Sequence, residues 1–468
     1  MPLLRSIHAR VALLLAVVVV GLVGVRPLFL RSDIRPTSLR VDVLVVGGSP
    51  AGVAAAIAAA RQGMVVVLAE PRSFLGTVLT GAMLNMIDAS RKADGTSLIR
   101  GIYQELARQI DGLTFDPMQV REILRAMVEA EAGVTVYLRT SLDRPLLEGQ
   151  RVIGARLRVD DGHVFTVHAA VTVDATDDGD LAAAAGVAFT LGREASGIDR
   201  RMMPATLLFR VADLDWSTIK RYAWSQRRGR QPSGATTGYA WGFRDAMRNY
   251  DPPDPALSAH DLNIGRIPDG SAWINSLQIH DVDGTSAASR QQGYARARRE
   301  IPHLVAYLRG NCPGFSTARL LETAPELYIR ETRHLRGLYV LTADDIAQRK
   351  RFWDRIGAAS YPVDLHQYSK GERYPFKPIR REYTIPLRSL VTAQVDGLFV
   401  ASRAFSATYE AAGSARVVPT TMAMGEGVGV AAAVAVAYRL TPHQLLERRE
   451  LVADVQGRLV RSGVLIDY

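Results

Sequence analysis

The chain of 468 residues contains a single cysteine, Cys312. One cysteine excludes an intrachain disulfide, a CxxC redox pair and an iron–sulfur cluster held by cysteines. The nine histidines are scattered along the chain, and neither an HxH nor an HExxH spacing occurs. We therefore expect no dedicated metal site.

Acidic residues are fewer than basic ones, 47 against 57, which gives a formal net charge of +10. Such an excess is typical of proteins that bind nucleic acid or an anionic membrane surface. The densest arginine clusters, at residues 227–230 and 295–299, are not interleaved with aromatic side chains on which bases stack. We interpret them as solvated faces and expect no nucleic-acid partner.

Near the N-terminus, residues 11–25 form a run of fifteen apolar residues without a charge, bounded by Arg10 and Arg26. A membrane-spanning helix needs roughly 20 apolar residues. The run fits either a secretory signal or an uncleaved membrane anchor. No Ala-x-Ala cleavage site follows it, which favours the anchor, and more arginines follow the run than precede it. We therefore expect a single N-terminal span with the catalytic body in the cytoplasm, export being the alternative.

The segment "VDVLVVGGSPAGVAAAIAAARQGMVVVLAE", residues 41–70, has the order strand, glycine turn, helix, strand and acid. This order is typical of a dinucleotide-binding unit. Glu70 lies 18 residues after Gly52, close to the spacing of about 20 at which a carboxylate accepts ribose hydroxyls. Gly47 and Gly48 suit the tight turn, and Pro50 suits the first helical turn. Ser49 replaces the second glycine of GxGxxG, and its hydroxyl is available for a phosphate oxygen.

Two later segments have a similar organisation. "VTVDATDDGDLAAAAGVAF", residues 171–189, predicts a strand, a turn and a helix of small residues. Residues 395–438 predict a strand, a loop and a long helix that begins near Gly425. Gly425, Gly427 and Gly429 would remove side chains where a cofactor ring lies against the backbone.

With "MMPATLLFRV", "IRETRHLRGLYVLTADDI" and "IPLRSL", these segments resemble bacterial FAD-dependent oxidoreductases of the glutathione-reductase-like superfamily over roughly residues 40–440. The resemblance implies an α/β fold with a Rossmann-like FAD-binding domain, discontinuous in sequence, and an inserted α+β substrate domain. An N-terminal apolar helix would precede it. The expected divisions are residues 1–30 as anchor or signal, 31–40 as linker, 41–192 and 380–440 as FAD-binding domain, 193–379 as substrate domain and 441–468 as helical tail.

The resemblance also implies FAD as the cofactor. Gly47, Ser49 and Gly52 would hold the pyrophosphate, Glu70 would hold the adenosine ribose, and the glycines of the late helix would lie at the flavin. The other cofactor-binding residues would be Gly48, Pro50, Ala51, Ala175 and Thr176.

The chain departs from the family at three points. Asp177 and Ser402 stand where glycine is usual, and "LGT" at residues 75–77 stands where relatives often have two glycines. A carboxylate repels a pyrophosphate, so we expect Asp177 either to point away from it or to weaken FAD binding.

The candidate catalytic residues are Arg416, Arg333, His334 and Tyr409. A cation or hydrogen-bond donor is needed near the pyrimidine edge of a flavin, where the reduced ring carries negative charge. Arg416 precedes the late helix, and Arg333 and His334 lie in "ETRHLRG". Tyr409 with Glu410 is a further acid–base pair. Arg416, Arg333 and His334 also each fit a structural ion pair, for example Arg333 with Glu331. Asn85 and Met86 are expected at the flavin face.

The sequence contains no second strand–GxGxxG–helix unit, so a separate NAD(P)H domain is not indicated. The main hypothesis is a membrane-anchored dehydrogenase or oxidase that passes hydride from a small organic substrate to flavin N5. A membrane quinone, oxygen or an electron-transfer partner would accept the electrons. The first alternative is a flavin-dependent reductase of an isoprenoid-like hydrophobic substrate. The second is a non-catalytic flavin-binding subunit of an electron-transfer complex.

Overall fold

The computed structural model describes residues 36–88, 90–92, 94–110, 114–228, 232–372 and 379–468. The predicted N-terminal apolar helix lies outside these residues, as do residues 31–35 of the predicted linker. The first strand begins at Ser38 rather than Val41. Its early start has a physical reason, because Ser38 and Leu39 already pair with the neighbouring strand at Thr166 and Val167. Residues 38–40 are therefore part of the fold and not linker.

The first sheet is mixed, with seven strands among the described residues. In spatial order these are β3 (Val134–Tyr137), β2 (Val66–Ala69), β1 (Ser38–Val46), β6 (Val164–Asp174), β5 (Arg151–Val159) and β4 (Thr140–Glu148), and β20 (Leu398–Val400) pairs with β6. The first four run parallel, β5 and β4 are antiparallel, and β20 is parallel to the end of β6. Because β20 comes from the last fifth of the chain, this sheet is assembled from two separate parts of the sequence.

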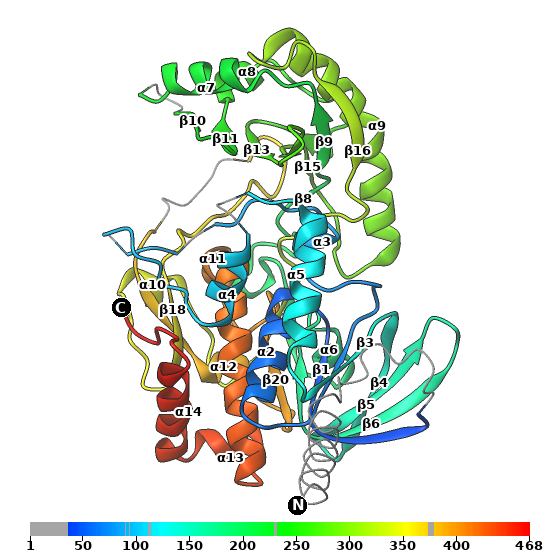
Figure 1. Ribbon diagram of the computed structural model, residues 1–468, viewed down its shortest axis with the longest axis vertical. Helices are drawn as coiled ribbons and strands as arrows, with labels where there is room; N and C mark the ends of the chain where they lie inside the picture. The colour runs from blue at the N-terminus through cyan, green and yellow to red at the C-terminus, as the bar shows by residue number, and fades with distance from the viewer. Residues whose placement is uncertain (1–35, 89, 93, 111–113, 229–231, 373–378) are drawn as a thin grey trace, which may run out of the picture. The chain divides into compact units, whose positions relative to one another are not determined.

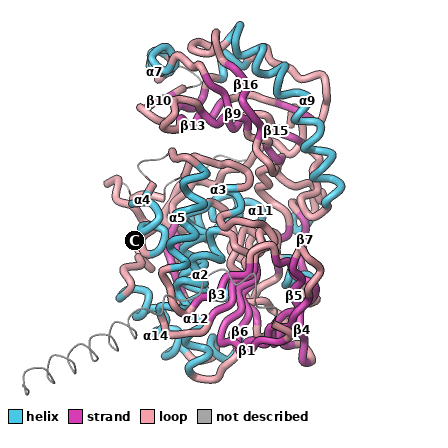
Figure 2. Tube along the Cα trace, turned by 45° about the vertical axis from the view of Figure 1, so that its right-hand side comes forward, coloured by secondary structure: helices cyan, strands magenta, loops and turns pink. Residues whose placement is uncertain are grey.

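Both faces of this sheet are covered, as its continuous apolar strands predict. Val43 and Val45 of β1 pack on one side with α2 (Pro50–Arg61), and Leu44 and Val46 pack on the other with α6 (Asp180–Ala184). Figure 2 shows α2 and α12 (Val418–Ala437) beside these strands. The carboxyl ends of β1, β6 and β20 lie together, because Val46 pairs with Asp174 and Asp174 with Val400.

Helices α2 and α12 run side by side at very close range (Figure 1). A Cβ added to Gly425 would lie 2.0 Å from the carbonyl oxygen of Ala51, and one added to Gly429 would lie 2.4 Å from that of Ala55. At Gly427 an added Cβ would meet Ile356 at 2.7 Å. These glycines therefore allow helix packing, and the prediction that they face a flavin ring is wrong. The predicted start of the helix near Gly425 is also wrong, because α12 begins at Val418 with Pro419 in its first turn.

A second sheet is formed by the middle of the chain. Its strands in order are β10 (Gly234–Ala235), β11 (Tyr239–Gly242), β13 (Leu262–Arg266), β14 (Ala272–Asn275), β9 (Phe209–Ala212) and β16 (Arg319–Thr323). Helix α9 (Ala287–Asn311) packs with this sheet in a core of its own, and Figure 1 shows it beside β9 and β16. The predicted α+β insertion between the two parts of the first sheet is thus observed for residues 205–323.

The predicted boundary at residue 379 is displaced from the packing boundary. Strand β18 (Arg355–Ala359) pairs with β19 (Tyr383–Pro386), across that boundary. Ile356 and Leu341 belong to the core that contains α2 and α12. Two paired strands must belong to the same domain. The chain therefore rejoins the first core well before residue 380.

Further elements fill in the fold. The two helices predicted between residues 98 and 132 are α4 (Ile102–Gln109) and α5 (Pro117–Glu129), and the helical tail contains α13 (Pro442–Leu446) and α14 (Arg449–Arg461). The shorter elements are α3 (Thr77–Thr80), β7 (Phe189–Leu191), η1 (Glu194–Ser196), β8 (Ala205–Thr206), α7 (Trp216–Ser225), α8 (Arg244–Met247), β12 (Leu257–Ser258), β15 (Gln278–Ile279), β17 (Arg333–Leu335), α10 (Ala343–Ala347), η2 (Leu387–Leu390) and α11 (Tyr409–Ala415).

Among the described residues, α12 is the helix long and apolar enough to cross a membrane. However, 89% of its apolar window is buried inside the fold. It packs against α2 and β18 and is a helix of the core beside the first sheet.

Candidate active site

Three adjoining cavities run past the carboxyl ends of β1 and β6 in the described part of the chain. The first, here the Glu70 cavity, has a volume of about 500 Å³ and is lined by Gly47, Glu70, Ala175 and Asp177 among others. The narrow cavity, of about 40 Å³, is lined by Ser49, Pro50 and Ala51 and by the start of α12. The Arg330 cavity, of about 870 Å³, opens towards the second sheet.

The cavities share walls, which places them in one line. Asp177 and Arg403 line both the Glu70 cavity and the narrow cavity. Met86, Arg330 and Arg416 line both the narrow cavity and the Arg330 cavity. A long ligand held at Glu70 can therefore reach past α2 to Arg416.

The glycine turn brings the N-terminus of α2 to the narrow cavity. Gly52 cannot carry a side chain, because an added Cβ would lie 2.0 Å from the carbonyl oxygen of Gly47. The Ser49 hydroxyl accepts from the Gly52 N–H at 3.2 Å and donates to the Ala175 carbonyl at 2.8 Å. Its proton is therefore committed within the protein, and the expected donation to a phosphate is wrong. Within the described residues, the N–H groups of Ser49 and Ala51 donate to no protein atom and remain available for an anion.

Glu70 is buried at the end of β2, and its carboxylate joins the turn to the next loop. One oxygen accepts from the Gly48 N–H at 2.7 Å, and the other accepts from the Arg72 N–H at 2.9 Å. Burial raises the pKa of Glu70, and the Arg72 charge opposes that shift. The position, facing the Glu70 cavity, suits a carboxylate that accepts the hydroxyls of a ribose.

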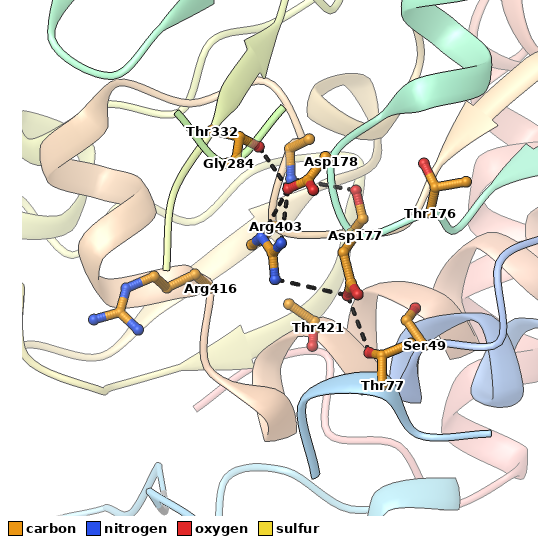
Figure 3. Close-up of polar contacts among 12 residues, drawn as sticks. Ser49, Thr77, Thr176, Asp177, Asp178, Gly284, Thr332, Arg403, Arg416 and Thr421 are labelled. Atoms are coloured by element: carbon orange, nitrogen blue, oxygen red, sulfur yellow. Dashed lines mark hydrogen bonds and ion pairs between the residues drawn. The ribbon is translucent and has the colours of Figure 1, made fainter. Parts of the chain in front are cut away.

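One of the two alternatives expected for Asp177 is wrong, because this residue does not point away from the line of cavities. Figure 3 shows its side chain between Thr77 and Arg403. It accepts from the Thr77 hydroxyl at 3.2 Å and lies 3.8 Å from the Arg403 guanidinium. Arg403 also donates to Asp178 at 2.7 Å. The negative charge of Asp177 thus stays beside the narrow cavity and is compensated by Arg403.

Arg416 lies at the junction of α11 and α12 and is buried in the wall of the Arg330 cavity. Its guanidinium pairs with the Asp364 carboxylate at 2.9 Å and donates to the Tyr328 hydroxyl at 2.8 Å. Its Nε atom is buried without a partner among the described residues. Burial raises the pKa of Asp364, but the charges of His366 and Arg416 outweigh it and hold that pKa well below its ordinary value. Arg416 thus lies directly before α12 and is engaged in an ion pair, and its role at a flavin stays a prediction.

The other predicted catalytic residues do not line the three cavities. His334 is paired with Glu331 at 2.8 Å and is buried. Arg333 pairs with Asp180 at 2.7 Å instead of with Glu331. Tyr409 packs edge-on against Tyr368. These three are therefore held in structural contacts, and the structure does not bring them to Arg416.

Of the two residues expected at the flavin face, one lines the cavities and the other does not. Met86 lines the narrow cavity and the Arg330 cavity. The Asn85 side chain is instead buried, and it donates to the Gly265 carbonyl at 2.9 Å.

Several site residues escaped the sequence analysis. Asp88 has accessible surface in the Arg330 cavity, but enclosing protein desolvates its carboxyl and raises its pKa to about 6, the charge of Asp364 adding to the effect. Arg330 and Tyr328 line the same cavity. One available signal was the alternation of Tyr328 and Arg330, which places both side chains on one side of an extended segment. Asp88 carried no local signal.

The described residues fit FAD at the points where it must be held. Free N–H groups of the α2 N-terminus and the Arg403 cation suit the pyrophosphate, and Glu70 suits the adenosine ribose. Val417, Val418 and Thr421 line the narrow cavity, so the N-terminus of α12 lies at this cavity, although the helix begins earlier than predicted. That it faces the flavin stays a prediction. Asp177, which lines both the Glu70 cavity and the narrow cavity, opposes an anionic cofactor, as do the neighbouring acids Asp178 and Asp180 of the Glu70 cavity.

The comparisons with known proteins agree with this fit. The model of the family described as FAD dependent oxidoreductase matches residues 42–459. A digeranylgeranylglycerophospholipid reductase of Methanosarcina acetivorans is 30% identical over 225 residues, which are 43% of this chain and 51% of the relative. The corresponding enzyme of Methanosarcina mazei is 28% identical over 233 residues, 44% of this chain and 51% of the relative. The chain spans about half the length of these relatives.

Two solved structures that match this chain do so at low sequence identity. A geranylgeranyl bacteriochlorophyll reductase-like protein from Thermoplasma acidophilum is 12% identical with a TM-score of 0.45, covering 92% of this chain and 89% of that one. A flavin-dependent brominase is 11% identical with a TM-score of 0.44, covering 85% of this chain and 80% of that one.

Proposed function

Because the chain belongs to the family of FAD-dependent oxidoreductases, and is thus an enzyme with FAD as its cofactor, we propose that it oxidises a small polar organic molecule in the Arg330 cavity. Bound FAD supplies a two-electron acceptor at flavin N5. A separate molecule, a quinone or oxygen, then takes the electrons. The narrower assignment to the glutathione-reductase-like superfamily of bacteria rests on the sequence motifs.

One observation carries this proposal: the Arg330 cavity and the narrow cavity share Met86, Asp88 and Arg416. A substrate in the wider cavity therefore lies next to the flavin end of a cofactor held by α2. Arg416, with Tyr328, offers a positive charge and donors at that end. Asp88, at the same wall, is a carboxyl with a pKa of about 6, suited to accept a proton near neutral pH.

Anaerobic mixing tests this proposal on the FAD-loaded full-length protein. Loss of the flavin absorbance band would be followed after adding polar organic donors, NADH or NADPH. We expect an organic donor to bleach the flavin and the nicotinamides to leave it oxidised. Rapid bleaching by NADH or NADPH, with no bleaching by any organic donor, would contradict the proposal.

A second candidate function is reduction of an isoprenoid double bond. The two Methanosarcina relatives, which are named as reductases of this kind, support it. Charged side chains in the lining of the Arg330 cavity, among them Asp88, Arg330 and Asp364, speak against it, because pockets for hydrocarbon chains are lined mainly by apolar side chains. Anaerobic reoxidation of the reduced protein by geranylgeranyl lipid, without reoxidation by the oxidised polar product, would favour this second candidate.

Membrane attachment by residues 11–25 is a separate part of the proposal, and the apolar run in the sequence supports it. The truncation that tests it removes residues 1–34, because Pro36 already accepts from His163 at 2.8 Å. We expect the full-length protein in the membrane fraction and the truncated protein in solution with its FAD. Full-length protein in the cytosol, or a mature N-terminus beyond residue 25, would contradict the anchor.

A further inference from the structure

Arg330 is a buried cation on the wall between the narrow cavity and the Arg330 cavity. The residue is 4% exposed. Its Nη1 donates to the Thr206 hydroxyl at 2.6 Å and to the Pro204 carbonyl at 2.8 Å. Its Nη2 reaches Asn275 only at 3.5 Å. These neutral oxygens hold one corner of the guanidinium and leave the Nε–Nη2 edge free of strong contacts.

No carboxylate pairs with Arg330 among the described residues, although acids lie in the same cavity. Asp364 is paired with Arg416 at 2.9 Å, and Asp261 is paired with Arg244 at 3.1 Å. Asp88 lines the cavity, and the charge of Arg330 lowers the pKa of its carboxyl, but no ion pair joins the two residues. The acids that are paired are therefore already balanced by other arginines.

An unpaired buried charge is costly, because the guanidinium loses hydration and cannot release its proton. The face of Tyr328, whose ring centre lies 4.4 Å from the guanidinium, compensates part of this loss. A neutral ligand would not compensate the positive charge of Arg330. An anion that enters the cavity supplies the missing partner.

We propose that Arg330 binds a carboxylate group of the substrate, and hence that the substrate is a polar organic acid. The free Nε–Nη2 edge is a planar fork that matches the two oxygens of a carboxylate. This inference rests on the proposed function, because it names the class of molecule oxidised in the same cavity. A polar organic acid is a different class of substrate from an isoprenoid hydrocarbon, so the two proposals can be told apart.

Arg330 also touches the narrow cavity, so a second role has to be distinguished. A cation there can balance the negative charge of a reduced flavin. That role predicts a lowered flavin reduction potential when Arg330 is neutralised, and no change in the binding of anions to the oxidised protein. The two roles are separated by measuring both quantities.

The test uses FAD-loaded full-length protein and follows the flavin spectrum during titration with acetate, succinate, citrate and benzoate. Succinamide, the neutral diamide of succinate, and inorganic phosphate serve as comparison probes. We expect saturable binding of at least one carboxylate, and weaker binding of succinamide and phosphate. Arg330→Gln should weaken that carboxylate by roughly 10- to 100-fold, the range for a lost charge-assisted hydrogen bond. Arg330→Lys should restore part of it.

Arg319→Gln is the matched control, because Arg319 is exposed and lines none of the three cavities. It should bind carboxylates as the unchanged protein does. The proposal is overturned if no carboxylate binds, if phosphate or succinamide binds as tightly, or if Arg330→Gln changes only the reduction potential. FAD content and bleaching by neutral donors are scored in the same samples. A loss of carboxylate dependence with bleaching intact therefore leaves the oxidoreductase proposal standing.

Discussion

The Glu70 cavity and the Arg330 cavity each have an arginine in their walls, and the charges of the two arginines are balanced in opposite ways. Arg403 contacts Asp178 at 2.7 Å and lies 3.8 Å from Asp177. Arg330 contacts only neutral oxygens and a tyrosine ring. At the first cavity the protein supplies its own counter-charges, so a dianionic cofactor has to compete with them. At the second cavity the counter-charge is expected to come from the ligand.

Replacing Arg403 is expected to have the largest effect, because it leaves the buried Asp178 without its cation. Breaking such a pair from one side costs about 3–5 kcal/mol. We expect Arg403→Gln to lower the Tm of the protein and to weaken FAD binding by about 100-fold or more, the equivalent of some 2.7 kcal/mol. Calorimetric titration of the apoprotein with FAD measures the second effect. Unchanged FAD affinity would mean that Asp178 and the pyrophosphate do not share Arg403.

A smaller loss is expected at Glu70. Glu70→Gln keeps the shape of the side chain but removes a charged acceptor for the ribose, an effect of roughly 1.5–3 kcal/mol. Both oxygens of Glu70 also accept from backbone N–H groups, those of Gly48 and Arg72. Glu70→Ala would lose both hydrogen bonds, whereas Gln can keep one of them, so Gln disturbs the turn less. The dissociation constant of FAD is the measurement. A Gln variant with the affinity of the unchanged protein would place the ribose elsewhere.

Removing the charge of Asp177 is expected to act in the opposite direction. Asp177→Asn should tighten FAD binding by about tenfold, because one negative charge beside the pyrophosphate is lost. Burial raises the pKa of Asp177 above its ordinary value, with Arg403 opposing. The carboxylate therefore takes up a proton as the pH falls, and FAD binding to the unchanged protein should tighten with falling pH. This pH dependence should be weaker in Asp177→Asn. Equal pH slopes in both proteins would exclude Asp177 as its origin.

The smallest expected effect is that of Asp88. This residue lines the Arg330 cavity and not the Glu70 cavity, so a role in proton transfer would distinguish the two cavities. Its pKa of about 6 means that it is ionised above pH 6 and protonated below. As a proton acceptor it would make the rate of flavin bleaching by a donor rise through about pH 6 and level off above it. Stopped-flow rates against pH should lose this step in Asp88→Asn. The same step in the variant would assign it to another group.

The sequence predicted the Glu70 cavity much better than the Arg330 cavity, for a physical reason. Gly47, Ser49, Gly52 and Glu70 lie within one strand–helix–strand unit, where spacing along the chain sets their positions. Asp88, Arg330 and Arg416 meet only because the second sheet closes on the first, and no local pattern reports such a meeting.

The predictions were wrong where one sequence pattern fits two different structural roles. Gly425 and Gly429 were interpreted as space for a flavin ring, but their missing side chains admit the backbone of α2. His334 and Arg333 were chosen as polar residues near the expected site. They are engaged with Glu331 and Asp180, while Arg330, three residues before Arg333, faces the cavity.

The most direct test of the contrast between the two arginines is one calorimetric series, in which FAD is titrated into the apo forms of the unchanged protein, Arg403→Gln and Arg330→Gln. We expect Arg403→Gln to weaken FAD binding by about 100-fold. We expect Arg330→Gln to leave the dissociation constant of FAD within about threefold, a change below 1 kcal/mol, because its partner is the substrate. A strong loss of FAD affinity in Arg330→Gln, with normal affinity in Arg403→Gln, would contradict this contrast.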